Sequence, residues 1–295
     1  NPMELPPEVG GLYGSPIWEK MSEKERNELM RHSQSWNISQ FLQGEQAALL
    51  CAAKIVQQVP DLDAKFYAAT QVMDEARHVE AYRLLLKKFE VAYPMTSPLQ
   101  ELVDQALRDS RWDMTYLAMQ VVIEGLALAA FGAIRDMAQN PLARMVNAYV
   151  MEDEARHVAF GRISLRDYYP QLTQAERDER EEFLTEACWL MRGRMTDARE
   201  VYRALDLPVE ECVQFSENSE ITQHYRSMLF QRIVPIVKDI GIFGKGIQKT
   251  FDEMGVLGYA DLDPEELQKD DEAKAKEFDA RRAYVEAVAK AGGDA

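Results

Sequence analysis

The sequence is poor in cysteine and in positive charge, and it has almost no signals for β-strands. Its three cysteines, Cys51, Cys188 and Cys212, are widely spaced, so they form neither a disulfide framework nor a C-x-x-C zinc or redox pair. This cysteine usage indicates a reducing compartment. The 34 Lys and Arg against 50 Asp and Glu give a net charge of −16, which argues against nucleic acid as a partner.

The start of the chain lacks the basic and apolar segments of a signal peptide. One run, residues 116–134, is apolar enough to compare with a membrane span, but Glu124 lies near its middle. Because a carboxylate inside a lone spanning helix is costly, we expect this run to be a helix buried within the protein. The expectation is a cytoplasmic protein without a membrane partner.

The 15 glycines are few for a chain of 295 residues, and apolar residues recur at intervals of three and four. This pattern predicts an all-α fold. Pro60-Asp61 separates the first two expected helices, and Asn140-Pro141 supplies an N-cap and a first-turn proline for the fourth. The expected helices span residues 35–58, 61–90, 110–138, 141–169, 174–204 and 218–240.

We divide the chain into three parts by composition. Residues 1–30 form an N-terminal extension expected to wrap the surface, and residues 31–260 form the helical domain. Residues 261–295 form a charged C-terminal tail, expected to be a solvated helix or a frayed end.

An internal repeat is the most informative feature of the chain. The hexapeptide Asp-Glu-Ala-Arg-His-Val occurs at residues 74–79 and again at residues 153–158, an offset of 153 − 74 = 79 residues. Glu45 and Glu124 are separated by the same 79 residues. Each half of the repeat therefore holds a glutamate, followed thirty residues later by Glu-x-x-His.

The spacing within each half places its glutamates at one height. Pro60 is fifteen residues from Glu45 and fifteen from Glu75, so a hairpin that turns there brings the two side chains level, about 22 Å from the turn. The second half turns in the same way at residues 139–140. Two hairpins packed face to face would bring six side chains to one buried place: Glu45, Glu75, His78, Glu124, Glu154 and His157.

Four carboxylates in an apolar interior need compensation, because an unpaired buried charge costs many kcal/mol. Two divalent cations cancel four negative charges. Carboxylate and imidazole donors in this proportion suit iron or manganese better than a closed zinc site. We therefore expect two iron ions (Fe), with a manganese–iron pair as the alternative.

The aspartate of each hexapeptide is a candidate hydrogen-bond acceptor for the ring nitrogen of a ligand histidine that does not bind the metal. A metal-bound histidine usually donates its other ring N–H to a carboxylate. By the pseudo-symmetry of the repeat, we expect Asp153 to orient His78 and Asp74 to orient His157.

Three other residues of the repeat have candidate roles. Arg77 and Arg156 are expected to hold these aspartates in place. Tyr82 lies one turn beyond His78 on the same side of the helix, so it is a candidate redox-active catalytic residue. The alternative is a packed tyrosine with a satisfied hydroxyl group, and the second half has Gly161 at that position.

These motifs resemble the ferritin-like di-iron superfamily, whose known ligand set is one Glu from each of two helices and Glu-x-x-His from each of two others. The double Asp-Glu-x-Arg-His motif is most similar to the hydroxylase subunits of bacterial multicomponent monooxygenases, over about residues 36–169. The resemblance implies a ferritin-like four-helix bundle with additional helices, and a homodimer. It also implies that reduced di-iron activates dioxygen for hydroxylation.

Three positions distinguish this sequence from, or link it to, individual members of the superfamily. Leu128 stands where those monooxygenases carry a hydroxyl-bearing threonine. Tyr82 matches the radical tyrosine of the radical-generating subunit of ribonucleotide reductase. Val150 stands where aromatic-amine N-oxygenases carry an extra ligand histidine, one turn before the second Glu-x-x-His.

The function expected is a non-haem di-iron oxidase or oxygenase. It would use dioxygen and two external electrons to oxidise a small, largely apolar organic substrate. Since the chain has no ferredoxin-type cysteine cluster and no dinucleotide glycine motif, the electrons would come from a separate ferredoxin or reductase. By helical phase, the candidate pocket residues are Phe41, Ala48, Ala127, Leu128 and Phe131.

Two other functions are compatible with the same ligands. The protein could be a radical-generating metallosubunit that acts through Tyr82 for a partner enzyme. It could also be a ferroxidase or iron-handling protein similar to ferritin, which would hold many irons per chain.

Overall fold

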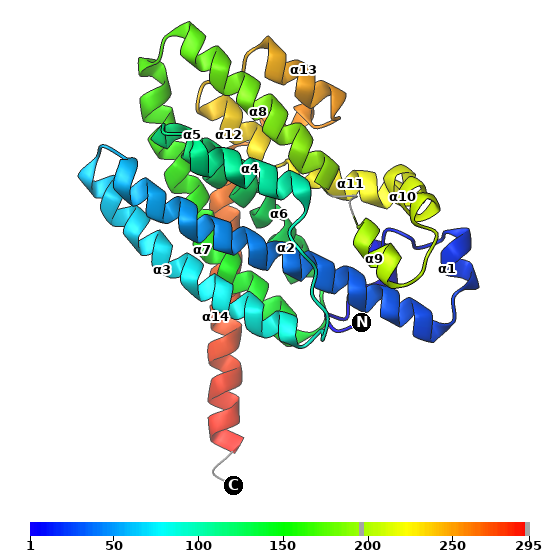
Figure 1. The fold of residues 1–295 in the computed structure, drawn as a ribbon. Helices are drawn as coiled ribbons and strands as arrows, with labels where there is room; N and C mark the ends of the chain where they lie inside the picture. Colours follow the sequence, from blue (N-terminus) through cyan, green and yellow to red (C-terminus); the bar gives the residue numbers. More distant parts are fainter. Residues whose placement is uncertain (195–197, 293–295) are drawn as a thin grey trace.

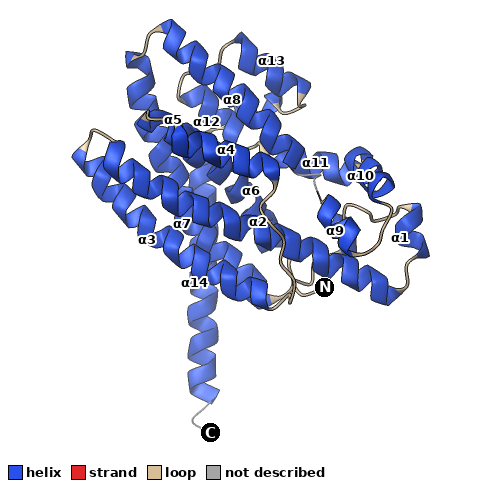
Figure 2. Cartoon of the chain, in the orientation of Figure 1, coloured by secondary structure: helices blue, strands red, loops and turns tan. Residues whose placement is uncertain are grey.

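A computed structural model describes residues 1–194 and 198–292 of the chain, and every element assigned within those ranges is a helix (Figures 1 and 2). The all-α class predicted from the sequence is therefore confirmed. The elements are η1 (Pro7–Val9), α1 (Pro16–Lys20), α2 (Glu23–Gln58), α3 (Leu62–Lys87), α4 (Ser97–Arg108), α5 (Trp112–Tyr116), η2 (Leu117–Ile123), α6 (Glu124–Met137), α7 (Pro141–Tyr168), η3 (Tyr169–Gln171), α8 (Gln174–Arg194), α9 (Arg199–Ala204), α10 (Val209–Asn218), α11 (Glu220–Leu229), α12 (Ile233–Asp239), α13 (Lys245–Glu253), η4 (Leu257–Asp261) and α14 (Pro264–Gly292).

Two helical hairpins form the centre of the molecule. Helix α2 packs along α3, and α6 packs along α7 (Figure 1). The first hairpin turns because Pro60 cannot continue α2, and Asp61 caps α3 by accepting a hydrogen bond from the Ala64 N–H at 2.8 Å. The second turns at Asn140, which accepts from two N–H groups of α7.

The helix that carries Glu124 lies in the core. Helices α5 and α6 are continuous with η2, a π-helical segment, so the chain is helical from Trp112 to Met137. Within the described ranges this is the one helix long and apolar enough to cross a membrane, and 89% of its most apolar window is buried in the protein. It therefore packs as a core helix, as the buried Glu124 requires.

The predicted N-terminal extension, residues 1–30, differs from the structure at its end. Helix α2 begins at Glu23 because Ser22 and Glu25 form a reciprocal capping box. The segment before it lies against the core, where Met3 and Trp18 are buried. The predicted extension, residues 1–30, thus includes the first two turns of α2.

The tail, residues 261–295, was predicted to be a solvated helix or a frayed end, and in the structure part of it packs on the body. Its described part is mainly α14, which packs on α7 and α12 before extending away from the body (Figure 1). Asp271 of α14 is buried and pairs with Arg232 at 2.8 Å. This contact is invisible in the charge pattern, because it depends on where α12 lies.

The helices after α7 are shorter than predicted. The expected helix 174–204 is α8 up to Arg194 and α9 from Arg199, and residues 195–197 lie outside the described ranges. The expected helix 218–240 is broken into α11 and α12 at residues 230–232. Helix α4 was not predicted, although its buried residues Leu99, Leu102, Val103 and Ala106 have helical spacing.

Candidate metal centre

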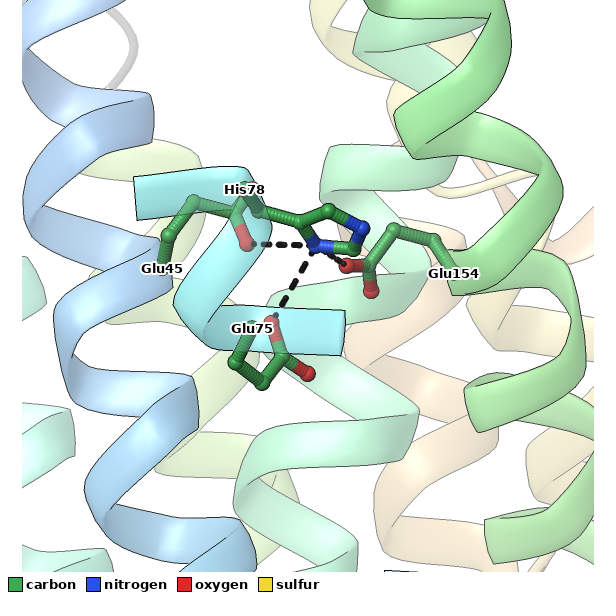
Figure 3. Close-up of side chains that lie close together, drawn as sticks. All are labelled: Glu45, Glu75, His78 and Glu154. Atoms are coloured by element: carbon green, nitrogen blue, oxygen red, sulfur yellow. Dashed lines mark hydrogen bonds and ion pairs between the residues drawn. The ribbon is translucent and has the colours of Figure 1, made fainter. Parts of the chain in front are cut away.

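The two hairpins bring the six predicted ligands to one buried place. Glu45 comes from α2, Glu75 and His78 from α3, and Glu154 from α7, and their polar atoms point toward one another (Figure 3). Glu124 at the start of α6 and His157 of α7 complete the set. None of the six is more than 5% exposed.

One group of candidate ligands surrounds His78. Its ring Nδ1 lies 3.2 Å from Glu45 Oε2, 3.3 Å from Glu75 Oε2 and 3.0 Å from Glu154 Oε1 (Figure 3). The ligand atoms of these four residues all lie within 4.8 Å of one another. One cation can contact all four, since metal–ligand distances for nitrogen and oxygen are about 2.0–2.2 Å.

A second group of four surrounds His157, and it shares two members with the first. It comprises Glu75, Glu124, Glu154 and His157, again with ligand atoms within 4.8 Å. His157 Nδ1 lies 3.2 Å from Glu75 Oε1 and 3.6 Å from Glu154 Oε2. Glu75 and Glu154 thus present one oxygen to each histidine, which is the arrangement of carboxylates that bridge two metal ions.

The hydrogen bonding of these side chains indicates that something else binds them. Glu75 Oε2, Glu124 Oε2, both carboxylate oxygens of Glu154 and the Nδ1 of His157 are buried and have no hydrogen-bond partner. Each such buried group costs about 1–3 kcal/mol when it is left unsatisfied. Burial, together with the neighbouring acid Glu154, raises the pKa of Glu45 and that of Glu124 well above their ordinary values. Two divalent cations would satisfy these atoms and offset the four negative charges.

The outer nitrogen of each histidine faces an aspartate from the opposite hairpin. His78 Nε2 lies 3.0 Å from Asp153 Oδ2, and His157 Nε2 lies 3.3 Å from Asp74 Oδ2. If each Nε2–H donates to its aspartate, each Nδ1 keeps a free lone pair toward the carboxylate cluster.

The arginines of the repeat lie against these aspartates at the surface. Arg77 donates to Asp74 and also reaches Asp153 Oδ2 at 3.4 Å, and Arg156 donates to Asp153. Burial raises the pKa of Asp153, but the hydrogen bond with His78 and the charges of His78, Arg156 and Arg77 together outweigh it, so the pKa of Asp153 lies below its ordinary value. The aspartate therefore stays ionised and can accept from the histidine.

Two glutamines that the sequence analysis missed support the cluster. Gln71 Nε2 donates to Glu75 Oε1 at 3.1 Å and to Glu124 Oε1 at 3.0 Å, so it joins the two hairpins. Gln120 Nε2 donates in turn to Gln71 Oε1 at 3.3 Å. Each glutamine stands four residues before a cluster glutamate, and this i, i+4 spacing was the available signal.

Tyr82 lies in the core near the cluster. Its side chain is fully buried, its hydroxyl donates to Asn147 Oδ1 at 3.1 Å, and its ring packs against Phe41 and Phe131. Burial raises its pKa, with smaller contributions from Glu45 and Glu154. In the described ranges its hydroxyl makes no hydrogen bond to a cluster carboxylate.

A cavity between α2, α6 and α11 opens directly onto the cluster. Glu45, Glu124 and Glu154 form part of its wall. Of the five pocket residues expected, four line this cavity, and Leu128 instead lines a separate cavity under α14. The four are Phe41, Ala48, Ala127 and Phe131; further wall residues that sequence analysis missed include Trp36, Arg194 and Tyr225.

The fold and the cluster define the class of the protein as ferritin-like di-iron. The solved structure of "Protein 19 with aldehyde deformylating oxidase activity from Synechococcus" matches with a TM-score of 0.58 at 16% identity, over 76% of this chain and 97% of that chain. The predicted ferritin-like bundle with additional helices is thereby confirmed.

The chain belongs to the family described as p-aminobenzoate N-oxygenase AurF. The family model matches residues 2–241, which is 240 of the 295 residues. Among the curated proteins compared, none matches the chain. Membership confirms the predicted superfamily, the di-iron cofactor and oxidase or oxygenase activity toward a small organic substrate.

The position of Val150 is informative within this family. By the resemblance, Val150 stands where aromatic-amine N-oxygenases carry an extra ligand histidine. Val150 is buried on α7, one turn before Glu154. His32 and His224, the other histidines of the chain, belong to neither candidate metal group. Two histidines are thus available to the centre, not three.

Proposed function

We propose that the protein is a di-iron monooxygenase that transfers one oxygen atom of dioxygen to a small organic substrate. The balance is substrate plus O₂, two electrons and two protons, giving oxygenated substrate and water. The single observation that carries this proposal is the cavity, which places an apolar wall beside three carboxylates of the candidate metal centre.

The six residues of the cluster would hold the two metal ions. In this assignment, Glu45 and His78 would hold one ion, Glu124 and His157 would hold the other, and Glu75 and Glu154 would be available to either; the distances to the two histidines support it. When bound, a pair of iron ions supplies the activation of dioxygen.

The residues around the centre would orient the ligand histidines, hold the substrate and exclude water. Asp74 and Asp153 would orient the two histidines through their Nε2 atoms. Phe41 and Phe131, whose ring centroids lie 4.8 Å apart, form an apolar wall that holds the substrate and excludes water from the reacting atoms.

Several partners belong to the same proposal. The electrons come from a separate ferredoxin or reductase, because the chain's three cysteines lie apart and are buried as free thiols. Reduced thiols of this kind support a cytoplasmic location. The active form would be a homodimer, as the resemblance implies.

The proposal is tested by oxygen labelling. The iron-loaded protein is reduced without oxygen and then exposed to ¹⁸O₂ with a panel of small aromatic amines, p-aminobenzoate included, and apolar aldehydes. We expect mass spectrometry to find one ¹⁸O atom in the product of at least one compound, with two electrons consumed per product. Oxidation of substrates without any incorporated label would contradict monooxygenation and identify an oxidase. Storage of many irons per chain would support the iron-handling alternative.

Radical generation through Tyr82 is the second candidate, favoured by the burial of Tyr82 near Glu45 and Glu154. We predict that Tyr82→Phe keeps the oxygenation activity, because the hydroxyl is hydrogen bonded to Asn147 and not to the cluster. The variant should lose about 1 kcal/mol of unfolding free energy with that hydrogen bond. Chemical denaturation and the labelling assay measure the two effects. If the wild-type protein shows a tyrosyl signal in electron paramagnetic resonance, and the variant loses both that signal and the activity, the radical role is established instead.

A further inference from the structure

Arg194, at the described end of α8, is a buried cation that has no ion-pair partner among residues 1–194 and 198–292. It is 9% exposed, and its Nε has no hydrogen-bond partner. Among the described residues, no carboxylate lies within 4.0 Å of its guanidinium group. The other buried arginines all have such partners: Arg135 pairs with Asp136 at 2.7 Å, Arg162 with Glu265 at 3.3 Å and Arg180 with Asp113 at 2.9 Å.

The side chain of Arg194 lines the same cavity as the metal-site carboxylates Glu45, Glu124 and Glu154. No ion pair joins it to any of them, so its guanidinium nitrogens lie more than 4.0 Å from their carboxylate oxygens. The rest of the cavity wall is mostly apolar and includes Phe41, Ala127 and Phe131.

Arg194 is charged at neutral pH despite its burial. Burial lowers its pKa to about 10, which is still well above 7. Tyr225, beside it in the cavity wall, has a pKa raised by burial to about 12, so its hydroxyl group is protonated. Arg194 and Tyr225 therefore contribute a cation and a neutral hydroxyl group to the cavity wall.

A buried, unpaired cation is costly unless a ligand supplies the opposite charge. The planar guanidinium group matches a carboxylate best, because it can donate two parallel hydrogen bonds to the two oxygens. A substrate with a carboxylate at one end and an apolar body would satisfy Arg194 and still extend along the wall toward the metal centre.

We propose that Arg194 binds the carboxylate of an anionic organic substrate whose apolar part lies against the di-iron centre. This inference rests on the proposed function, since it places the substrate in the same cavity. It assigns Arg194 as a binding residue that sets the substrate class.

The test compares ligands that differ only in charge. Benzoate and benzamide, and hexanoate and hexanamide, are titrated by calorimetry into the iron-loaded protein without oxygen. We expect the carboxylate of at least one pair to bind about tenfold or more tightly than its amide, because hydrogen bonds to charged groups are the strong ones.

Substitutions then assign that preference to one side chain. Arg194→Gln should abolish the preference, and Arg194→Lys should keep part of it. Arg192→Gln is the matched control, because it removes the same charge from the same helix at a side chain that packs on Trp189 and not in the cavity. Iron content is measured for each variant, and two irons per chain show that the centre is intact.

The outcomes separate this inference from the proposed function. Equal binding of carboxylates and amides by the wild-type protein in every pair would overturn the inference, as would a preference that survives in Arg194→Gln. If Arg194→Gln does not fold, the inference is tested by the carboxylate preference of the wild-type protein and by its partial loss in Arg194→Lys. Carboxylate selectivity without any oxygenated product would leave the binding role in place and contradict monooxygenation alone.

Discussion

At the scale of single residues, the four glutamates of the centre are of two kinds. Glu75 and Glu154 each turn one oxygen toward each histidine, whereas Glu45 and Glu124 each belong to one group. The repeat could predict the residues because identical hexapeptides at the same distance from the turns of two hairpins occupy equivalent places. Arg194 could not be predicted in this way, since its role depends on a cavity formed by helices distant in the sequence.

The aspartates behind the histidines give a prediction at this scale. Asp153→Ala should weaken iron binding by about 10- to 100-fold, because His78 loses the partner that fixes its ring. Asp153→Asn keeps an acceptor and should lose less. Asp167→Ala, at an exposed position of the same helix, is the control. Anaerobic titration with Fe(II) measures the affinities. An unchanged affinity in Asp153→Ala would show that Asp153 does not orient the ligand.

At the scale of elements, the π-helical segment η2 is the feature that sequence patterns did not reveal. The helical phase of residues 110–138 predicted a regular helix, but residues 117–123 widen to π-helix just before Glu124. Such segments are common at functional sites. Here the segment carries Gln120, which supports the Gln71 bridge between Glu75 and Glu124. A regular period cannot show this, because one extra residue per turn changes which side chains face inward.

Gly161 of α7 makes room for this segment. A Cβ atom added at Gly161 would lie 2.5 Å from Gln120 Cβ, so Gly161→Ala must displace η2. We expect a loss of about 1–3 kcal/mol in unfolding free energy, together with weaker iron binding through Gln71. Gly44→Ala is the control, since nothing lies within 4 Å of its added Cβ and alanine favours the helix. Chemical denaturation measures both, and equal stability of the two variants would refute the packing argument.

At the scale of the whole molecule, the two hairpins were predictable and the outer helices were not. The hairpins follow from Pro60, Asn140 and the repeat spacing, all of which are local signals. The start of α2 at Glu23 and the docking of α14 depend on other elements. Asp271 illustrates this, because an acidic residue in a charged stretch is buried only through its contact with Arg232 of the segment before α12.

Without metal ions, the charges of the centre can be balanced only by protons, so the stability of the metal-free protein depends on pH. Burial and Glu154 raise the pKa values of Glu45 and Glu124 above the ordinary 4.5. Burial lowers the pKa of His78, but its hydrogen bonds with Asp153 and the cluster acids raise it above 6.5. Groups with raised pKa values stabilise the fold below their unfolded pKa, and this stability is lost as the pH rises toward the folded value.

The metal-free protein should therefore be less stable at about pH 8 than at about pH 5.5, by at least about 1.4 kcal/mol, which corresponds to one proton over one pH unit. The iron-loaded protein should be stabilised most at the higher pH, where the ligands are deprotonated. Denaturation of chelator-treated and iron-loaded samples at both pH values measures this. A metal-free protein that is equally or more stable at the higher pH would contradict the charge argument.

The most direct test of the account is the metal content and position in the iron-loaded protein. Iron analysis combined with anomalous diffraction at the iron edge should find two iron ions per chain, both among the six side chains of Glu45, Glu75, His78, Glu124, Glu154 and His157. Glu124→Ala should abolish this stoichiometric binding. Iron located elsewhere, or two ions still tightly bound in Glu124→Ala, would contradict the assignment of the centre.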